Sequence, residues 1–271
     1  MMKKTLCLFF LLTIYVSAFA QLTEIIPSSV SIANTSVART DNWSGFGNPA
    51  SLIQSEGIQA AMQFENKSLL PELSTKLLQA AYNHKLMNVG VAFSHFGYSK
   101  YNEMLVGLVL ARNFGDKFSL GLQGNFYTSY FSDKIKYQST FIPQVGMTAH
   151  LTPQFTLGFH AFNPFQQNLK TDYIEKRLPS IFSIGTNYYF TENIAWLTQI
   201  DKEVSTNFRF ATGFEWQLLE TFGVKIGGYA SEYFVGCFGM GVQFVGLKLD
   251  VNCELHPVLG VNMIGKLSYI L

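Results

Sequence analysis

The chain has 271 residues, of which 48% are hydrophobic and 15% aromatic. Only 14% are charged, against about 25% in an average soluble domain. The 19 basic and 18 acidic residues nearly balance, so no basic surface of the kind that binds nucleic acid is expected. Outer-membrane barrels show the same shortage of charge because lipid covers their outer surface. A secreted, aromatic-rich sandwich is the alternative.

Residues 1–20 have the parts of a secretory signal peptide. Lys3 and Lys4 precede an apolar run, Leu6–Val16, and small residues lead up to Gln21. We expect cleavage after Ala20, because the run is too short to cross a bilayer. No later run approaches the length of a transmembrane helix, so the membrane, if crossed, must be crossed by strands.

Residues 21–56 show no alternation and are rich in Ser, Asn and Gly, which favour turns. From residue 57 onward, alternating segments and turns follow one another to the end of the chain. We predict fourteen strands of about ten residues, the length needed to cross a bilayer at a tilt. They are 57–66, 73–84, 88–97, 102–113, 118–131, 141–151, 154–163, 178–190, 194–203, 208–219, 222–232, 234–244, 247–257 and 259–271.

The segment Leu247–Leu255 is the clearest of these strands, because every odd-numbered residue is apolar and every even-numbered residue is polar or charged. A helix would scatter these residues around its axis, whereas a strand separates them onto two faces. A transmembrane barrel places one face against lipid and the other in a wet lumen. The predicted fold is therefore an all-β, antiparallel up-and-down barrel, formed by residues 57–271, in the outer membrane.

The joins between the predicted strands fall into two sets. One set is tight throughout, as at Val245-Gly246, while the longest joins, 132–140 and 164–179, belong to the other. Bacterial barrels have short turns on the periplasmic side, so we expect the tight set, together with both chain ends, to be periplasmic. A fourteen-strand barrel is too wide for its own side chains to fill, so residues 21–56 are the predicted luminal plug.

The predicted inward faces carry a set of charged and polar side chains: Asp201, Arg209, Glu215, Lys225, Lys248, Asp250, Glu254, His150 and His160. Cross-strand partners of opposite sign can brace the wall or bind an inserted segment. His150 and His160 could serve a metal or a proton, or be ordinary polar residues of the lumen. No metal motif, cofactor site or catalytic set is recognisable, so we expect a protein that is not an enzyme. Cys237 and Cys253 should lie on opposite faces, which excludes a disulfide between them.

A short motif precedes the first strand, where Asn48, Pro49 and Ala50 follow a stretch containing Trp43 and Phe46. This stretch, leading into a fourteen-strand barrel, resembles the long-chain fatty-acid transporter (FadL-like) superfamily and, more closely, its PorV/PorQ branch. The resemblance implies an accessory or scaffold of type IX protein secretion at the cell surface, with outer-membrane lipid and proteins of a secretion or assembly complex as partners. The alternative is a FadL-like passive channel for hydrophobic small molecules, in which Trp43, Phe46 and Leu52 could line the pocket. The short surface loops depart from the PorV/PorQ pattern.

Overall fold

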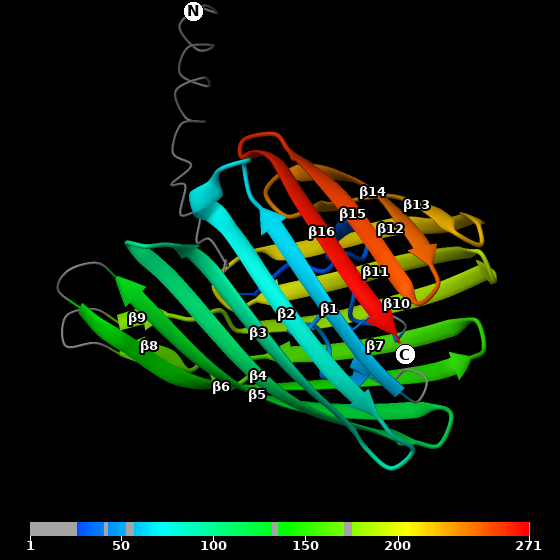
Figure 1. Ribbon diagram of the computed structural model, residues 1–271, viewed down its shortest axis with the longest axis horizontal. Helices are drawn as coiled ribbons and strands as arrows, with labels where there is room; N and C mark the ends of the chain where they lie inside the picture. Colours follow the sequence, from blue (N-terminus) through cyan, green and yellow to red (C-terminus); the bar gives the residue numbers. More distant parts are fainter. Residues whose placement is uncertain (1–25, 41–42, 53–56, 132–134, 171–174, 271) are drawn as a thin grey trace, which may run out of the picture.

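The computed structural model describes residues 26–40, 43–52, 57–131, 135–170 and 175–270. Fourteen of its strands form one closed antiparallel barrel, in which each strand pairs with its neighbours in chain order and β1 closes against β16 (Figure 1). The predicted fold class is therefore confirmed. The predicted signal peptide, residues 1–20, lies outside the described residues. Within the described part of the chain, no helix is long and apolar enough to span a membrane.

The wall comprises β1 (Gly57–Asn66), β2 (Ser74–Asn83), β3 (Asn88–Tyr98), β4 (Tyr101–Phe114), β5 (Phe118–Phe131), β6 (Ile135–Thr152), β7 (Phe155–Phe162), β10 (Ile181–Thr191), β11 (Ile194–Glu203), β12 (Phe208–Leu219), β13 (Phe222–Ala230), β14 (Phe234–Phe244), β15 (Leu247–His256) and β16 (Gly260–Ile270). Each predicted segment corresponds to one of these strands. Outside the wall are the β8 (Asn168–Lys170) and β9 (Glu175–Arg177) hairpin and the short helices η1 (Ile32–Asn34), η2 (Pro49–Leu52) and η3 (Pro71–Leu73). The hairpin was not predicted, because strands of three residues show no measurable alternation.

One end of the barrel, here called the turn end, carries the tight joins. Val245 and Gly246 form a two-residue turn in which both residues have positive φ, +39° and +77°. This backbone is that of the hairpin turn whose twist matches that of the flanking strands. It pairs Phe244 with Leu247 and Cys237 with Glu254, as the sequence predicts. Both cysteines are free, and Cys237 is buried.

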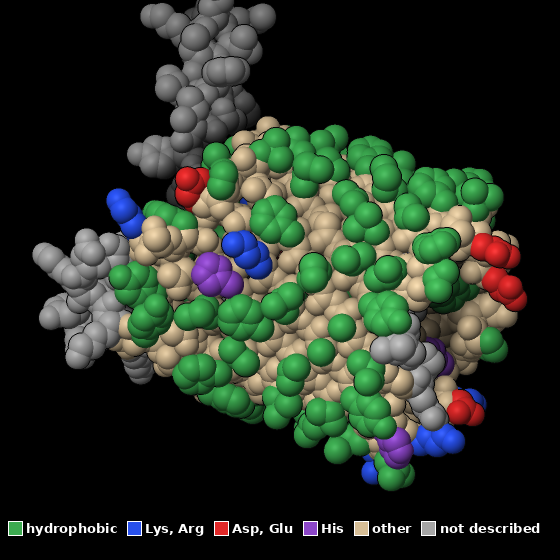
Figure 2. Space-filling model, in the orientation of Figure 1, with side chains coloured by type: hydrophobic (Ala, Val, Ile, Leu, Met, Phe, Trp, Pro, Cys, Tyr) green, Lys and Arg blue, Asp and Glu red, His purple; other side chains and the backbone are tan. Residues whose placement is uncertain are grey.

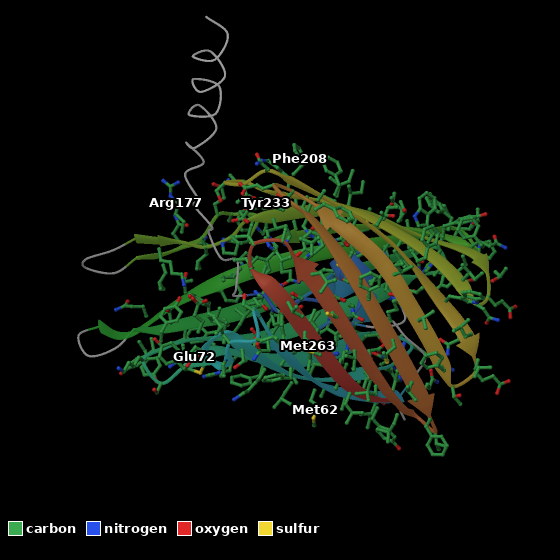
Figure 3. The ribbon with its side chains drawn as sticks, turned by 90° about the horizontal axis from the view of Figure 1, so that it is seen from above. Met62, Glu72, Arg177, Phe208, Tyr233 and Met263 are labelled. Atoms are coloured by element: carbon green, nitrogen blue, oxygen red, sulfur yellow. The ribbon has the colours of Figure 1, made fainter. Side chains whose placement is uncertain are left out.

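The opposite end, here called the loop end, carries the longer joins. The β8–β9 hairpin projects at this end (Figure 1). Glu72, Arg177 and Tyr233 belong to three of its joins and are labelled in Figure 3. The two ends therefore differ in loop length, as the sequence indicates for the join 164–179. The predicted long join 132–140 is wrong, because β6 already begins at Ile135 and its first residues pair with β5.

The outer surface of the wall is apolar. Leu122 is 62% exposed and Phe210 55%, although both are large hydrophobic residues in the middle of strands. Apolar side chains cover most of the wall in Figure 2, and Met62 of β1 points away from the barrel in Figure 3. A surface of this kind is stable against lipid and unstable against water.

Residues 26–40 and 43–52, here called the luminal segment, lie inside the barrel. The first of them lie at the loop end, where Ser28 donates hydrogen bonds to Glu65 through its backbone N–H (3.0 Å) and its hydroxyl (2.7 Å). The last lead to β1, which starts at the turn end beside the end of β16. The two ends of the wall, the start of β1 and the end of β16, lie together at the turn end as expected. The first described residues of the luminal segment lie at the loop end, and the N-terminus of the chain lies outside the described residues. A segment without alternation gives no sign of its direction.

The luminal segment packs against two separate parts of the wall. In the larger hydrophobic cluster, Trp43, Phe46 and Leu52 are almost fully buried against the inner side of β2–β7. In the smaller one, Ile32 and Ala33 pack against β11, β12 and β14. The segment therefore touches opposite sides of the barrel.

Candidate functional site in the barrel lumen

A belt of inward-facing glycines makes room for the luminal segment. It consists of Gly90, Gly107, Gly121, Gly146, Gly158, Gly185, Gly213 and Gly227. Six of the eight are cross-strand partners: Gly121 with Gly146, Gly158 with Gly185, and Gly213 with Gly227. A Cβ at any of the eight would meet an atom of the segment, so the missing side chains allow the close approach.

The motif Asn48-Pro49-Ala50 lies on the β5–β6 part of this belt. The Asn48 side-chain amide donates hydrogen bonds to the carbonyls of Val37 (2.6 Å) and Met147 (3.1 Å). Its oxygen accepts one from the Ala50 N–H (3.0 Å). Asn48 therefore joins two stretches of the luminal segment to one wall strand, a role that suits a carboxamide because it has two N–H donors beside a carbonyl acceptor.

Long polar side chains of the wall bind the backbone of the luminal segment rather than its side chains. Six such bonds are Gln144 to Phe46 O (3.0 Å), Gln123 to Gly45 O (3.0 Å), Gln79 and Lys266 to Trp43 O (2.7 and 2.8 Å), and Lys225 and Asn252 to Val30 O (2.8 and 2.7 Å). The sequence analysis missed this function of the amides and of Lys266. The signal was available, because inward-facing glycines and glutamines recur two residues apart, as at Gly121 and Gln123.

The predicted charged set both braces the wall and holds the segment. Asp201 pairs with Arg209 on the adjacent strand (2.6 Å), and Lys225 pairs with Asp250 (2.8 Å), which also has Lys248 at 3.7 Å. These contacts link wall to wall. Contacts from wall to segment are made by Glu215, which pairs with Arg39 and accepts the Ile32 N–H (3.0 Å), and by Arg209, which donates to the Ala33 carbonyl. The remaining member, Glu254, accepts a hydrogen bond from the Tyr229 hydroxyl (3.3 Å).

The two predicted histidines are not brought together as a pair. His150 shares a hydrogen bond with Thr156 (2.9 Å) near the turn end, whereas His160 is buried beside a cavity at the loop end. Among the residues described, no group of three or more His, Cys, Asp or Glu side chains could hold a metal ion.

Two cavities flank the luminal segment. The cavity at the loop end has a volume of about 500 Å³ and is lined by Phe162 and Ile181 of the wall and by Val37 and Phe46 of the segment, among others. The cavity at the turn end has a volume of about 200 Å³ and is lined by charged residues including Arg39 and Asp250. Of the three residues expected to line an apolar pocket, only Phe46 does so; Trp43 and Leu52 face the wall core instead. Trp43 fits there because Gly90, which has no side chain, leaves space for its indole ring.

The fold and its inner segment define a class, the closed fourteen-strand barrels with an N-terminal segment in the lumen. No family model and no curated protein matches the chain. Solved structures similar to it include the P. putida toluene transporter TodX (TM-score 0.59, 8% identity, 83% of this chain and 92% of that one). A Pseudomonas aeruginosa FadL homologue is also similar (TM-score 0.57, 10% identity, 88% of this chain and 95% of that one). So is the Acinetobacter baumannii outer-membrane protein Omp33 (TM-score 0.53, 10% identity, 80% of this chain and 98% of that one). At these identities the likeness establishes the fold, that of outer-membrane barrels.

Proposed function

We propose that this protein is an outer-membrane barrel, without catalytic activity, that lets a small apolar or amphipathic molecule pass from the cell surface toward the periplasm. The loop-end cavity is the observation that supports this proposal most strongly. It opens among the joins at 204–207, 231–233 and 257–259, and its lining mixes apolar side chains, among them Phe46, Phe162 and Ile181, with a larger number of polar ones, which suits an amphipathic molecule. The similar structures described as hydrocarbon channels agree with this function.

The route of such a molecule is set by the wall. Every pair of neighbouring wall strands is joined by a ladder of backbone pairs, and the register shifts at Ser129/Phe131, His150/Thr152, Tyr189/Thr191 and Gln217/Leu219 lie at strand ends. We therefore place the route along the lumen and past the luminal segment, rather than sideways through the wall. Passage of the molecule then requires part of the luminal segment to move. The predicted function of residues 21–56 as a plug stays a prediction.

Uptake into proteoliposomes tests this function. Purified barrel is reconstituted, and the entry of radiolabelled toluene and of a fatty acid is compared with entry into protein-free vesicles. We expect faster entry of at least one compound, and slower entry when Val235 is changed to Trp to fill the loop-end cavity. Entry at the protein-free rate for both compounds would contradict a transport function.

A secretion accessory of the PorV/PorQ kind is the second candidate, and the β8–β9 hairpin favours it. Lys176 of the hairpin donates hydrogen bonds to the hydroxyls of Tyr101 (2.9 Å) and Tyr127 (3.0 Å) and pairs with Glu103. These bonds fix the base of the hairpin, while Phe165 beside it is 73% exposed. A fixed projection with an exposed aromatic residue is suited to protein contact.

Gentle detergent purification from the native membrane separates the two candidates. Stoichiometric protein partners that are lost on changing Phe165 to Ser would support the accessory function. A lone barrel whose removal leaves surface display of exported proteins intact would contradict it. Mass spectrometry of the purified material identifies any partners that remain bound.

A further inference from the structure

We propose that the loop-end cavity selects small amphiphiles with an uncharged hydroxyl head over pure hydrocarbons and over carboxylates. This inference rests on the proposed transport function and adds the class of molecule carried. It comes from one row of polar residues at the base of the cavity.

The row runs across four neighbouring strands. His160 of β7 is the cross-strand partner of Ser183 of β10, Ser183 is the partner of Asp201 of β11, and Asp201 is the partner of Arg209 of β12. All four residues line the loop-end cavity. The row is therefore a continuous polar strip, and the apolar residues Phe46, Phe162 and Ile181 line the same cavity.

Two members of the row are free to bind a ligand. His160 is 6% exposed and its Nε2 atom has no hydrogen-bond partner among the described residues. Ser183, 4% exposed, lies opposite it on β10 and lines the same cavity. Sixteen buried side-chain atoms lack a hydrogen-bond partner among the described residues, and His160 Nε2 is the one of these sixteen whose residue lines the loop-end cavity, where a ligand could supply the missing hydrogen bond. Since no hydrogen bond joins the two side chains, they are not arranged as a nucleophile and its base. A ligand hydroxyl, which both donates and accepts, fits either tautomer of the imidazole.

The other two members are already occupied. Asp201 accepts hydrogen bonds from Arg209 (2.6 Å) and from the Gln199 amide (2.8 Å). Arg209 also donates to the Ala33 carbonyl and stacks on Tyr229, with its guanidinium carbon 4.2 Å from the ring centroid. The cation of this row, Arg209, is thus already paired and does not offer an unpaired charge to a ligand carboxylate.

The charge of the cavity lining also favours an uncharged hydroxyl over a carboxylate. Its lining contains three carboxylates, Asp201, Glu203 and Glu232, and two basic side chains, Lys67 and Arg209. A ligand carboxylate would add a negative charge to a lining with an excess of acidic groups, which is unfavourable at low local dielectric. An uncharged hydroxyl avoids this repulsion.

Calorimetric titration of the detergent-purified full chain with p-cresol, p-xylene and p-toluate tests the inference. These three compounds have nearly the same shape and differ in carrying a hydroxyl, a methyl group or a carboxylate. We compare the ratio of p-cresol to p-xylene affinity between wild type and His160→Phe, because this ratio cancels the different hydrophobicity of the ligands. Losing the hydrogen bond should lower the ratio about tenfold. His150→Phe, which changes a histidine outside the cavity, should leave it unchanged.

Ser183→Ala is a smaller change and carries the test if His160→Phe fails to fold; it should lower the ratio in the same direction. An unchanged ratio in both variants, or p-toluate binding more tightly than p-cresol, would overturn hydroxyl selection while leaving a small-molecule site in place. Binding of none of the three compounds, together with toluene entry at the protein-free rate, would overturn the transport function as well. The two failures are therefore distinguishable.

Discussion

Asn48 of the luminal segment lies directly over Gly146 of β6, so close that a methyl group on Gly146 would overlap the Asn48 amide. The amide is held there by the carbonyls of Val37 and Met147 and is 1% exposed. Segment and wall are in close contact here, so a substitution in either one should disturb the packing of the other.

Changing Gly146 to Ala should lower the free energy of unfolding by about 1–3 kcal/mol, because the added Cβ forces the Asn48 amide out of its place. Denaturant unfolding of the purified barrel measures this. Gly265→Ala on β16 is the matched control, since a Cβ there meets nothing within 4 Å. Equal stability of the two variants would contradict close packing of the segment.

Changing Asn48 to Asp keeps the size of the side chain but removes both of its donated hydrogen bonds. We expect a loss of about 1–3 kcal/mol, because two buried carbonyls lose a donor. Trypsin provides the readout: Arg39 is 6% exposed in the intact protein and should become cleavable as the segment loosens. Asn207→Asp, at an exposed join of the loop end, should leave Arg39 protected.

The buried pair of Arg39 and Glu215 should show strong non-additivity. Either Arg39→Gln or Glu215→Gln removes one half of this buried ion pair, at a cost of about 3–5 kcal/mol, whereas the double variant removes the pair as a whole. The double variant should therefore be more stable than the sum of the single effects, measured in a double-mutant cycle by denaturant unfolding. Simple additivity would mean that the two side chains act independently.

The orientation of the barrel can be tested with single cysteines. Asn207→Cys lies at the loop end and Asp116→Cys at the turn end, both exposed. Because short turns face the periplasm in bacterial barrels, a membrane-impermeant maleimide should label Asn207→Cys in intact cells and Asp116→Cys only after lysis. The wild-type protein, with Cys237 buried and Cys253 on the lipid face, gives the background. The reverse labelling pattern would show that the loop end faces the periplasm and the turn end faces the cell surface.

The wall was predictable because its signal is local. Alternation in Leu247–Leu255 identifies one strand and its two faces, and Val245-Gly246 fixes the register with the strand before it. Repeating this reading along the chain was enough to obtain the strand number. Only the extent of β6 differs noticeably: it begins at Ile135, six residues before the predicted start.

The inside of the barrel was not predictable to the same degree. The ion-pair partner of Glu215 is Arg39, which lies 176 residues away in the chain. No periodicity in the sequence connects these two positions. The sequence analysis recognised the charged positions but not their partners, and it did not recognise the glycine belt. A glycine in a strand signals close approach by another backbone, but not which one.

The path of the luminal segment has a consequence for how the barrel assembles. The segment passes through the lumen from the loop end and continues into β1, the strand that closes against β16. If the ring of strands closed first, Trp43 and everything before it would have to be drawn through the finished ring. We therefore expect the segment to settle on the open sheet, with Asn48 on β6 and Ile32 on β12, before the β1–β16 seam is made.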